Sequence, residues 1–226
     1  MATEEAERTR LSKSAVVDRA LRLADADGLD ALTIRRLAQD LGVTPMALYW
    51  HFRSKDELLE ALSERLWSEV DVTVGSDISW PDQLRAGLES LLVMLRAHPS
   101  GPRLVLEHEK RNDAALRATN NALEILRRAG FGPDEAVEVA RSALSTAIML
   151  VTSEPGLLPG LSAEQAAEHM RRDMIELSLL DPAKYPMVVE HAAKLTACDA
   201  TEFHYEFGVS LFIAGVEAMA KRPQST

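Results

Sequence analysis

The 226-residue sequence predicts an all-helical fold made of two parts, and three features of it lead to this expectation. Apolar residues recur three or four positions apart in every periodic segment, which is the spacing of an amphipathic helix. β-branched residues nowhere alternate with polar ones between turn signals, as they would in a half-buried strand. Glycine and proline interrupt the periodic segments at short intervals and divide the chain into separate helices.

Composition narrows the class of protein. Hydrophobic residues make up 46% and charged residues 27%, close to the average of globular domains. No apolar run approaches the ~20 residues of a membrane-spanning helix. The segment from Met1 to Glu7 is acidic and lacks the apolar core of a secretory signal. Cys198 is the only cysteine, which excludes an intramolecular disulfide and a cysteine-based zinc site. We therefore expect a soluble cytoplasmic protein.

Four helices are expected near the N-terminus, because four residues stand where a helix cap is needed. These residues are Ser12, Thr33, Thr44 and Ser54. Gly28 ends the first helix and Gly42 ends the second. The third helix, from about Pro45 to His51, is only about two turns long. Ser54 with Glu57 three residues later is a capping box, and it opens the fourth helix.

Six further helices are expected in the rest of the chain. Their approximate ranges are 79–98, 103–110, 113–129, 134–152, 162–179 and 201–221. Ser162 and Gln165 form a second possible capping box. The stretch 154–160 contains two prolines and two glycines and is expected to be a loop, and Pro182 and Pro186 are expected to interrupt the chain before the last helix.

Charge is unevenly distributed between the two parts of the chain. The whole chain has a net charge of −10, which argues against a protein that coats a polyanion over its entire surface. Residues 33–55 nevertheless carry a net charge of +3, whereas residues 68–226 carry −8. A polyanion is therefore expected to bind only at a small patch near the N-terminus.

Residues 33–51 have the pattern of a helix-turn-helix, in which the second helix enters the major groove of DNA with its N-terminus first. Its leading end carries the residues expected at base edges, which are Thr44, Pro45, Met46 and Ala47. Its trailing end offers donors and cations to phosphate oxygens through Tyr49, Trp50, His51 and Lys55. Leu48 is expected to pin the helix to the core, and Arg35 is placed to reach a guanine with two hydrogen bonds.

An alternative is that Tyr49, Trp50 and His51 form a packed aromatic corner of an ordinary helix bundle. Two aromatic residues and a histidine in a row on so short a helix, beside the only basic patch, favour contact with DNA. We therefore expect three regions, namely a helix-turn-helix DNA-binding domain at 1–55, a connecting helix at about 55–72, and a second helical domain at 73–226.

The segment from Leu32 to Phe52, LTIRRLAQDLGVTPMALYWHF, together with RSKDELL at 53–59, resembles the DNA-binding signature of TetR-family transcriptional regulators. The Tyr-Trp-His triplet is most similar to the tetracycline repressor branch. The resemblance implies a homodimer that binds a palindromic operator and whose C-terminal domain dimerises and binds a small-molecule inducer. It also implies that Arg35 reads a base, and that Thr33 joins the phosphate-contacting set. Pro45, Met46 and Ala47 differ from the tetracycline repressor's residues, so the operator sequence does not transfer.

Two sets of residues in the second domain are candidate binding surfaces. The expected dimer interface combines a small-residue stripe with an apolar stripe on the last helix, namely Ala136, Ala140, Ala143, Ala147, Phe207, Leu211, Ala214 and Ala218. The expected ligand cavity is adaptable and rich in methionine, and its residues are Met94, Leu104, His108, Asn120, Asn121, Met149, Met170 and Met174. In both cases the alternative is ordinary core packing.

No catalytic, nucleotide-binding or metal-binding motif is found, so we expect neither an enzyme nor a cofactor. Glutamate and histidine are adjacent at 107–109, 168–169 and 190–191, so their side chains point in different directions around a helix and do not converge on a metal ion. Cys198 is expected to be unreactive. Tetracycline repressors carry histidines where this chain has Val70 and Asp71, which argues against a magnesium–tetracycline inducer and favours a largely apolar one. The alternatives are an all-helical enzyme or small-molecule-binding protein without DNA binding, and a DNA-binding regulator controlled by a protein partner.

Overall fold

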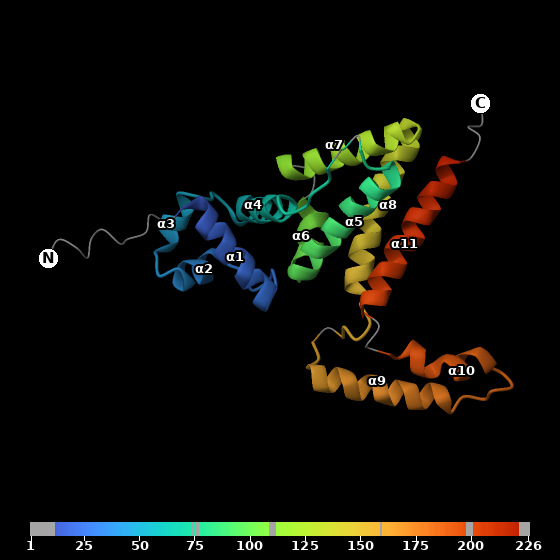
Figure 1. Ribbon diagram of the computed structural model, residues 1–226. Helices are drawn as coiled ribbons and strands as arrows, with labels where there is room; N and C mark the ends of the chain where they lie inside the picture. The colour runs from blue at the N-terminus through green and yellow to red at the C-terminus, as the bar shows by residue number, and fades with distance from the viewer. Residues whose placement is uncertain are drawn as a thin grey trace. The chain divides into compact units, whose positions relative to one another are not determined.

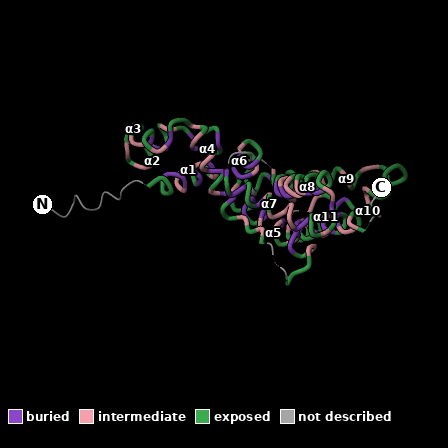
Figure 2. Tube along the Cα trace, turned by 90° about the horizontal axis from the view of Figure 1, so that it is seen from above, coloured by how far each residue is buried: buried purple, intermediate pink, exposed green. Residues whose placement is uncertain are grey.

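The computed structural model describes residues 12–73, 75, 77–108, 112–158, 160–197 and 201–221, and this part of the chain contains helices and no strand (Figure 1). The all-helical prediction is therefore confirmed. Two compact units are present, and the division between them falls inside one helix, between Leu144 and Ser145. Buried and exposed residues alternate along the helices, as expected of amphipathic elements (Figure 2). No described helix is long and apolar enough to cross a membrane.

The first unit contains seven complete helices and the start of an eighth. They are α1 (Lys13–Asp27), α2 (Ile34–Asp40), α3 (Pro45–Tyr49), α4 (Lys55–Trp67), α5 (Trp80–Ala97), α6 (Gly101–His108), α7 (Asp113–Arg128) and the part of α8 (Pro133–Thr152) up to Leu144. α1 packs on α2 and α4, α2 packs on α3, and α4 also packs on α6 and α7. α4 thus joins the N-terminal helices to the rest of the unit.

The four predicted N-terminal caps are confirmed. In each case the side-chain oxygen accepts a hydrogen bond from the backbone N–H three residues later, at Ser12, Thr33, Thr44 and Ser54. The capping box at Ser54 differs in one detail, because the Glu57 carboxylate accepts from the backbone N–H of Arg53 at 2.7 Å. Gly28 and Gly42 both have positive φ, which is the reason that glycine stands at these two turns.

Leu48 is fully buried and holds α3 against the other N-terminal helices, as predicted. Leu37 of α2, Phe52 and Leu58 are equally buried and form the core around it. α3 is only five residues long, so its position depends on this single anchor and on the Thr44 cap rather than on its own hydrogen bonds.

The second unit contains the end of α8 with α9 (Ala163–Ser178), α10 (Pro186–Leu195) and α11 (Thr201–Ala220). The capping box of Ser162 and Gln165 is complete, as predicted. α10 was not expected, because Pro186 was interpreted as an interruption. It stands at the first position of the helix instead, where the missing N–H removes no hydrogen bond. Cys198 lies outside the described residues.

α11 packs closely on the end of α8. A Cβ added to Gly208 would lie 2.4 Å from a methyl carbon of Leu150, so only glycine allows this approach without a shift. His204 Nε2 lies 2.9 Å from the carbonyl oxygen of Leu150, and the Tyr205 hydroxyl donates to Glu154 at 2.6 Å. The inner face of α11 is thereby fixed, with Tyr205 and Val209 buried in it.

Candidate nucleic-acid interface and ligand pocket

The outer face of α3 exposes large apolar side chains to solvent. Trp50 is 85% exposed, Met46 67% and Tyr49 48%, whereas Leu48 between them is fully buried. Pro45 and Thr44 are also exposed at the start of the helix, and Ala47 is half-buried. Because one face is pinned and the other presents bulky groups, α3 offers a rigid contact surface of the kind that a binding partner covers.

Arg35 on α2 is exposed, and no ion pair of its guanidinium exists within the part of the chain that the structure describes. Two other charged residues of α2 form ion pairs with α1. Arg36 pairs with Asp27, and Asp40 pairs with Arg19. Hydrogen bonding from the Arg19 guanidinium lowers the pKa of the Asp40 carboxyl below its usual range. Arg35 therefore remains available to an external anion or base edge.

Beyond the trailing end of α3, Lys55 makes a contact within the protein that its sequence position does not indicate. Its ammonium is half-buried and donates to the carbonyl oxygen of Leu29 at 3.2 Å, so it joins α4 to the turn between α1 and α2. His51 is half-buried as well, whereas Arg53 is exposed. Arg53 counted toward the basic patch but was not singled out as a site residue, although its position directly after the helix was a usable signal.

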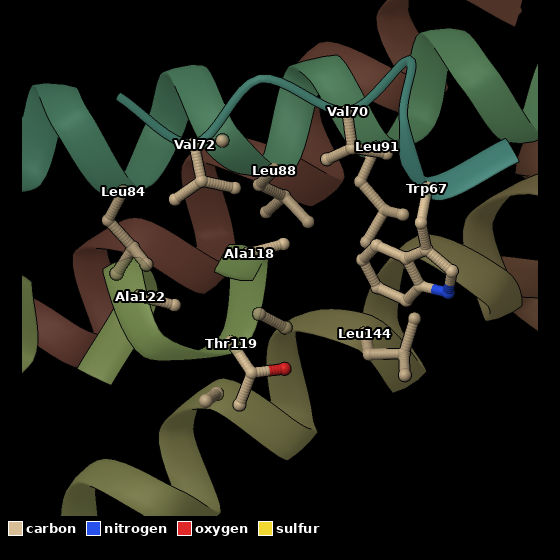
Figure 3. A pocket seen from close by; sticks show the side chains of 13 residues that line it. Trp67, Val70, Val72, Leu84, Leu88, Leu91, Ala118, Thr119, Ala122 and Leu144 are labelled. Carbon is tan, nitrogen blue, oxygen red and sulfur yellow. The ribbon is translucent and has the colours of Figure 1, made fainter. Parts of the chain in front are cut away.

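A cavity of about 80 Å³ lies inside the first unit between α4, α5, α7, α8 and the segment 70–72 (Figure 3). Its wall is aliphatic apart from the Trp67 indole and the Thr119 hydroxyl, and consists of Trp67, Val70, Val72, Leu84, Gly87, Leu88, Leu91, Ala118, Thr119, Ala122, Ala140, Ala143 and Leu144. This lining has no ionisable group and is suited to an apolar molecule.

Val70 and Val72 form one wall of the cavity, and the backbone around them is held by side chains from two helices. The Ser90 hydroxyl accepts from the Asp71 backbone N–H at 2.8 Å, and the Asn121 amide donates to the Val72 carbonyl at 2.8 Å. The buried Gln83 amide exchanges hydrogen bonds with the backbone of Gly75. These contacts keep Val70 and Val72 turned toward α5.

None of the eight residues predicted to line the ligand cavity is in this wall. Met94 and Leu104 are fully buried in the core, Asn120 is exposed, and His108 is half-buried at the end of α6. The Asn121 amide is used on Val72. Met149, Met170 and Met174 belong to the second unit. The expected cavity was rich in methionine, whereas the cavity in the first unit is lined mainly by valine, leucine and alanine.

The predicted dimer surface divides into two sets in the structure. Ala136 and Ala147 are buried within the chain itself, and Ala140 and Ala143 are half-buried in the pocket wall. The α8 stripe therefore faces the interior of its own chain, because small side chains permit close packing on either side of a helix. The α11 set is exposed, namely Phe207, Leu211, Ala214 and Ala218.

A cluster around Asp25 connects the N-terminal helices to the pocket-bearing ones. The Asp25 carboxylate lies 2.7 Å from His98 Nδ1, and it accepts from the Ser100 backbone N–H at 3.1 Å and from the Ser100 hydroxyl at 2.5 Å. Asp25 lies on α1, whereas His98 and Ser100 lie in the turn between α5 and α6. His98 Nε2 is also 3.4 Å from Glu69, just beyond α4. These contacts join α1 to the turn between α5 and α6 and to the end of α4.

Comparison with known proteins supports this interpretation of the geometry. Residues 16–62 match the family model of bacterial regulatory proteins of the TetR family, and residues 75–220 match the tetracycline repressor-like C-terminal domain. Tetracycline repressor protein class C of Escherichia coli is 30% identical over 93% of this chain and 92% of its own length. An HTH-type transcriptional regulator of Saccharopolyspora erythraea is 28% identical over 93% of this chain and 86% of its own length.

Solved structures agree with these relatives. The Streptomyces coelicolor TetR family protein ActR, in complex with actinorhodin, superimposes with a TM-score of 0.80 at 26% identity, over 94% of this chain and 99% of that one. Models of one family thus match both the N-terminal helices, which include the helix-turn-helix, and the C-terminal helices. The chain belongs to the TetR family of bacterial regulatory proteins and is a ligand-responsive transcriptional repressor.

Proposed function

We propose that two copies of this chain bind a palindromic operator through the exposed face of α3, and that an apolar small molecule releases them by entering the pocket of the first unit. The observation that carries the proposal is the exposure of Trp50, Met46 and Tyr49 on a helix that Leu48 pins from behind. Bulky side chains held rigidly in solvent are typical of a contact surface rather than of a core.

The residues of this surface divide into those that read bases and those that position the protein. Arg35, exposed and unpaired among the described residues, suits a bidentate contact with guanine. Met46 and Ala47 offer only apolar contact, for example with a thymine methyl group. Thr44 and Pro45 stand at the leading end of α3 and are assigned to base edges with Met46 and Ala47. Phosphate contacts are assigned to Thr33 at the start of α2 and to Tyr49, Trp50 and His51 at the trailing end of α3. Lys55 contributes through the donors that Leu29 does not use.

Dimerisation is assigned to the exposed face of α11. Tyr205 and Val209 are buried on one side of this helix, while Phe207 and Leu211 are 56% and 65% exposed on the other. A helix that is apolar all round is expected to be covered on both sides. Phe203 stacks on Phe207 with ring centroids 5.5 Å apart and extends the apolar face. We assign the second layer to α11 of a partner copy, with the exposed Met149 of α8 beside it.

The inducer is assigned to the aliphatic cavity, where burial contributes about 25 cal/mol per Å² of apolar surface. The wall holds no histidine or carboxylate, so a magnesium–tetracycline chelate has no metal ligand there. Entry of a ligand displaces α4 or α5 and, through His98 and Ser100, changes the position of α1. Calorimetric titration with tetracycline and magnesium is expected to show no binding; micromolar binding that disappears on chelation would contradict this assignment.

On this proposal the protein acts by binding alone, without catalysis, and it works in the cytoplasm, where a bacterial regulator meets its DNA. The test is fluorescence anisotropy with DNA flanking its own gene. Arg35→Ala is expected to weaken operator affinity by about 1–3 kcal/mol and to relax base preference at one position per half-site. Arg172→Ala on α9 has the same charge change far along the chain and serves as the control. Equal effects of the two variants would contradict the assignment of Arg35.

A further inference from the structure

A groove in the first unit adjoins the aliphatic cavity. It lies between α7 and α8 and has a volume of about 300 Å³. Leu116 is 57% exposed and Val137 is 41% exposed, so the groove opens to solvent. Its complete lining is Ala115, Leu116, Thr119, Leu123, Val137, Ala140, Arg141 and Leu144. Apart from Arg141 and the Thr119 hydroxyl, these side chains are aliphatic.

Three residues belong to the walls of both spaces. Thr119, Ala140 and Leu144 line the cavity and also line the groove. Figure 3 shows Thr119 and Leu144 on the side of the cavity opposite Val72. All three shared residues are half-buried. The cavity and the groove are therefore separated by a single layer of side chains, and Leu144 is the largest of them.

This layer is thin because α7 and α8 are not closely packed on each other. α7 packs on α4 and α5, and its packing on α8 is slighter in the part of the chain that the structure describes. The residues that the two helices contribute to the cavity wall are small, apart from Leu144, and are Ala118, Thr119, Ala122, Ala140 and Ala143. A change of the Leu144 side chain to another staggered rotamer is thus a small movement that joins the two spaces.

The cavity alone is too small for an ordinary inducer. Its volume is about 80 Å³, whereas an apolar cavity of about 150 Å³ accommodates one benzene molecule. Small-molecule sites usually have roughly 300–1,000 Å³. The cavity and the groove together fall within this range.

The two spaces differ in polarity. The cavity lining has no ionisable side chain. The groove contains Arg141, whose guanidinium pairs with Glu138 at 2.5 Å on the exposed side of α8. An elongated molecule can therefore bury an apolar end in the cavity and keep a polar group hydrated at the mouth of the groove, which avoids the cost of burying that group.

We propose that the inducer occupies the cavity and the groove as one continuous site, passing between α7 and α8 where Leu144 turns aside, and that it is an elongated molecule with an apolar inner end and a polar outer end. The proposal rests on the assignment of the inducer to this cavity. The groove is then both the route of entry and the outer part of the site. Leu116 and Val137 contact the outer part of the ligand.

Straight-chain alcohols measure the length of the site. 1-Hexanol and 1-decanol have the same polar group and differ only in chain length. Isothermal titration calorimetry on the wild-type chain is expected to show an affinity that rises about twofold to fourfold for each added methylene group up to 1-decanol. An affinity that stops rising once the chain exceeds the cavity, or a chain that binds neither alcohol, would overturn the proposal.

Two exposed leucines supply a matched pair of variants. Leu116 lines the groove and not the cavity, whereas Leu106 on α6 is 61% exposed and lines neither space. Leu116→Ala is expected to weaken binding of 1-decanol by about threefold to tenfold and to leave 1-hexanol unaffected. Leu106→Ala is expected to change neither affinity. Equal effects of the two variants on 1-decanol would overturn the proposal. So would a Leu116→Ala variant that sediments differently but binds 1-decanol normally, because a second copy of the chain would then cover the groove.

A further measurement needs no variant. In wild-type protein with ¹³C-labelled leucine methyl groups, 1-decanol is expected to shift the resonances of Leu88, Leu144 and Leu116 with one common midpoint. Leu88 lines only the cavity, so a shift of Leu88 without Leu116, or of Leu116 without Leu88, contradicts a continuous site. Operator binding is measured separately and without probes, so failure to bind DNA would refute the proposed function while leaving the continuous site to be judged by these data.

Discussion

The contact between Asp25 and the turn between α5 and α6 makes a quantitative prediction. Asp25→Ala removes the acceptor of three hydrogen bonds, one from His98 and two from Ser100. Ser100 is 7% exposed, so its donors are not rehydrated when the carboxylate is removed. Leaving a buried donor unsatisfied costs about 1–3 kcal/mol, and we expect a total loss of about 2–3 kcal/mol for this site. For a chain of this length the melting temperature falls by roughly 4–12 °C.

The matched control is Asp30→Ala, which removes one of the two carboxylate partners of Arg103 on α6, the other being Glu107. The Asp30 side chain is 89% exposed, so this ion pair is screened by solvent and its loss is expected to change stability by less than about 1 kcal/mol. Both variants are compared by thermal unfolding followed by circular dichroism. A second readout is operator affinity with and without a neutral apolar probe such as 9-fluorenone. Asp25→Ala is expected to reduce the difference between the two affinities. Equal melting temperatures for the two variants, or unchanged probe-induced release in Asp25→Ala, would refute the coupling through Asp25.

Three further predictions follow from single side chains. Gly87→Ala is expected to raise the melting temperature by about 2–4 °C through helix propensity, because the new methyl group meets Val72 at an ordinary 3.5 Å; a lower melting temperature would contradict this. Leu211→Glu is expected to shift sedimentation toward monomer, and an unchanged dimer would exclude this face of α11. Because Arg19 lowers the pKa of Asp40, the stabilisation from that carboxylate is present above about pH 4 and is lost as the pH falls further; Asp40→Asn should flatten the acid limb of the stability profile, and an unaltered limb would refute the pairing.

Local chemistry made the N-terminal helices predictable. The caps at Ser12, Thr33, Thr44 and Ser54 each act within three residues, so the sequence contains both partners of every cap. Leu48 was recognised because it is the branched aliphatic residue in the middle of a short helix. The contact of Lys55 with the carbonyl oxygen of Leu29 was not predictable, since Leu29 lies 26 residues earlier and carries no sequence signal.

The pocket was harder to predict because its wall is assembled from distant elements. Val72 and Gly87 meet only because α5 approaches the segment that follows α4, and neither residue type marks a binding site by itself. The alanine stripe of α8 shows a related limit. Periodicity identified Ala136 and Ala147 as one face of a helix, but a small-residue face packs equally well on its own chain or on a partner, and here it packs on its own.

The central claim, that the exposed face of α3 reads a two-fold operator, is tested most directly by footprinting on the DNA flanking the gene of this protein, combined with sedimentation of the complex. The expected result is a protected palindrome whose half-site centres lie about 34–36 Å apart or slightly more, bound by two chains, with protection shifted to higher protein concentration in Arg35→Ala. Protection of a single half-site by one chain, or a footprint that Arg35→Ala leaves unchanged, would contradict the account.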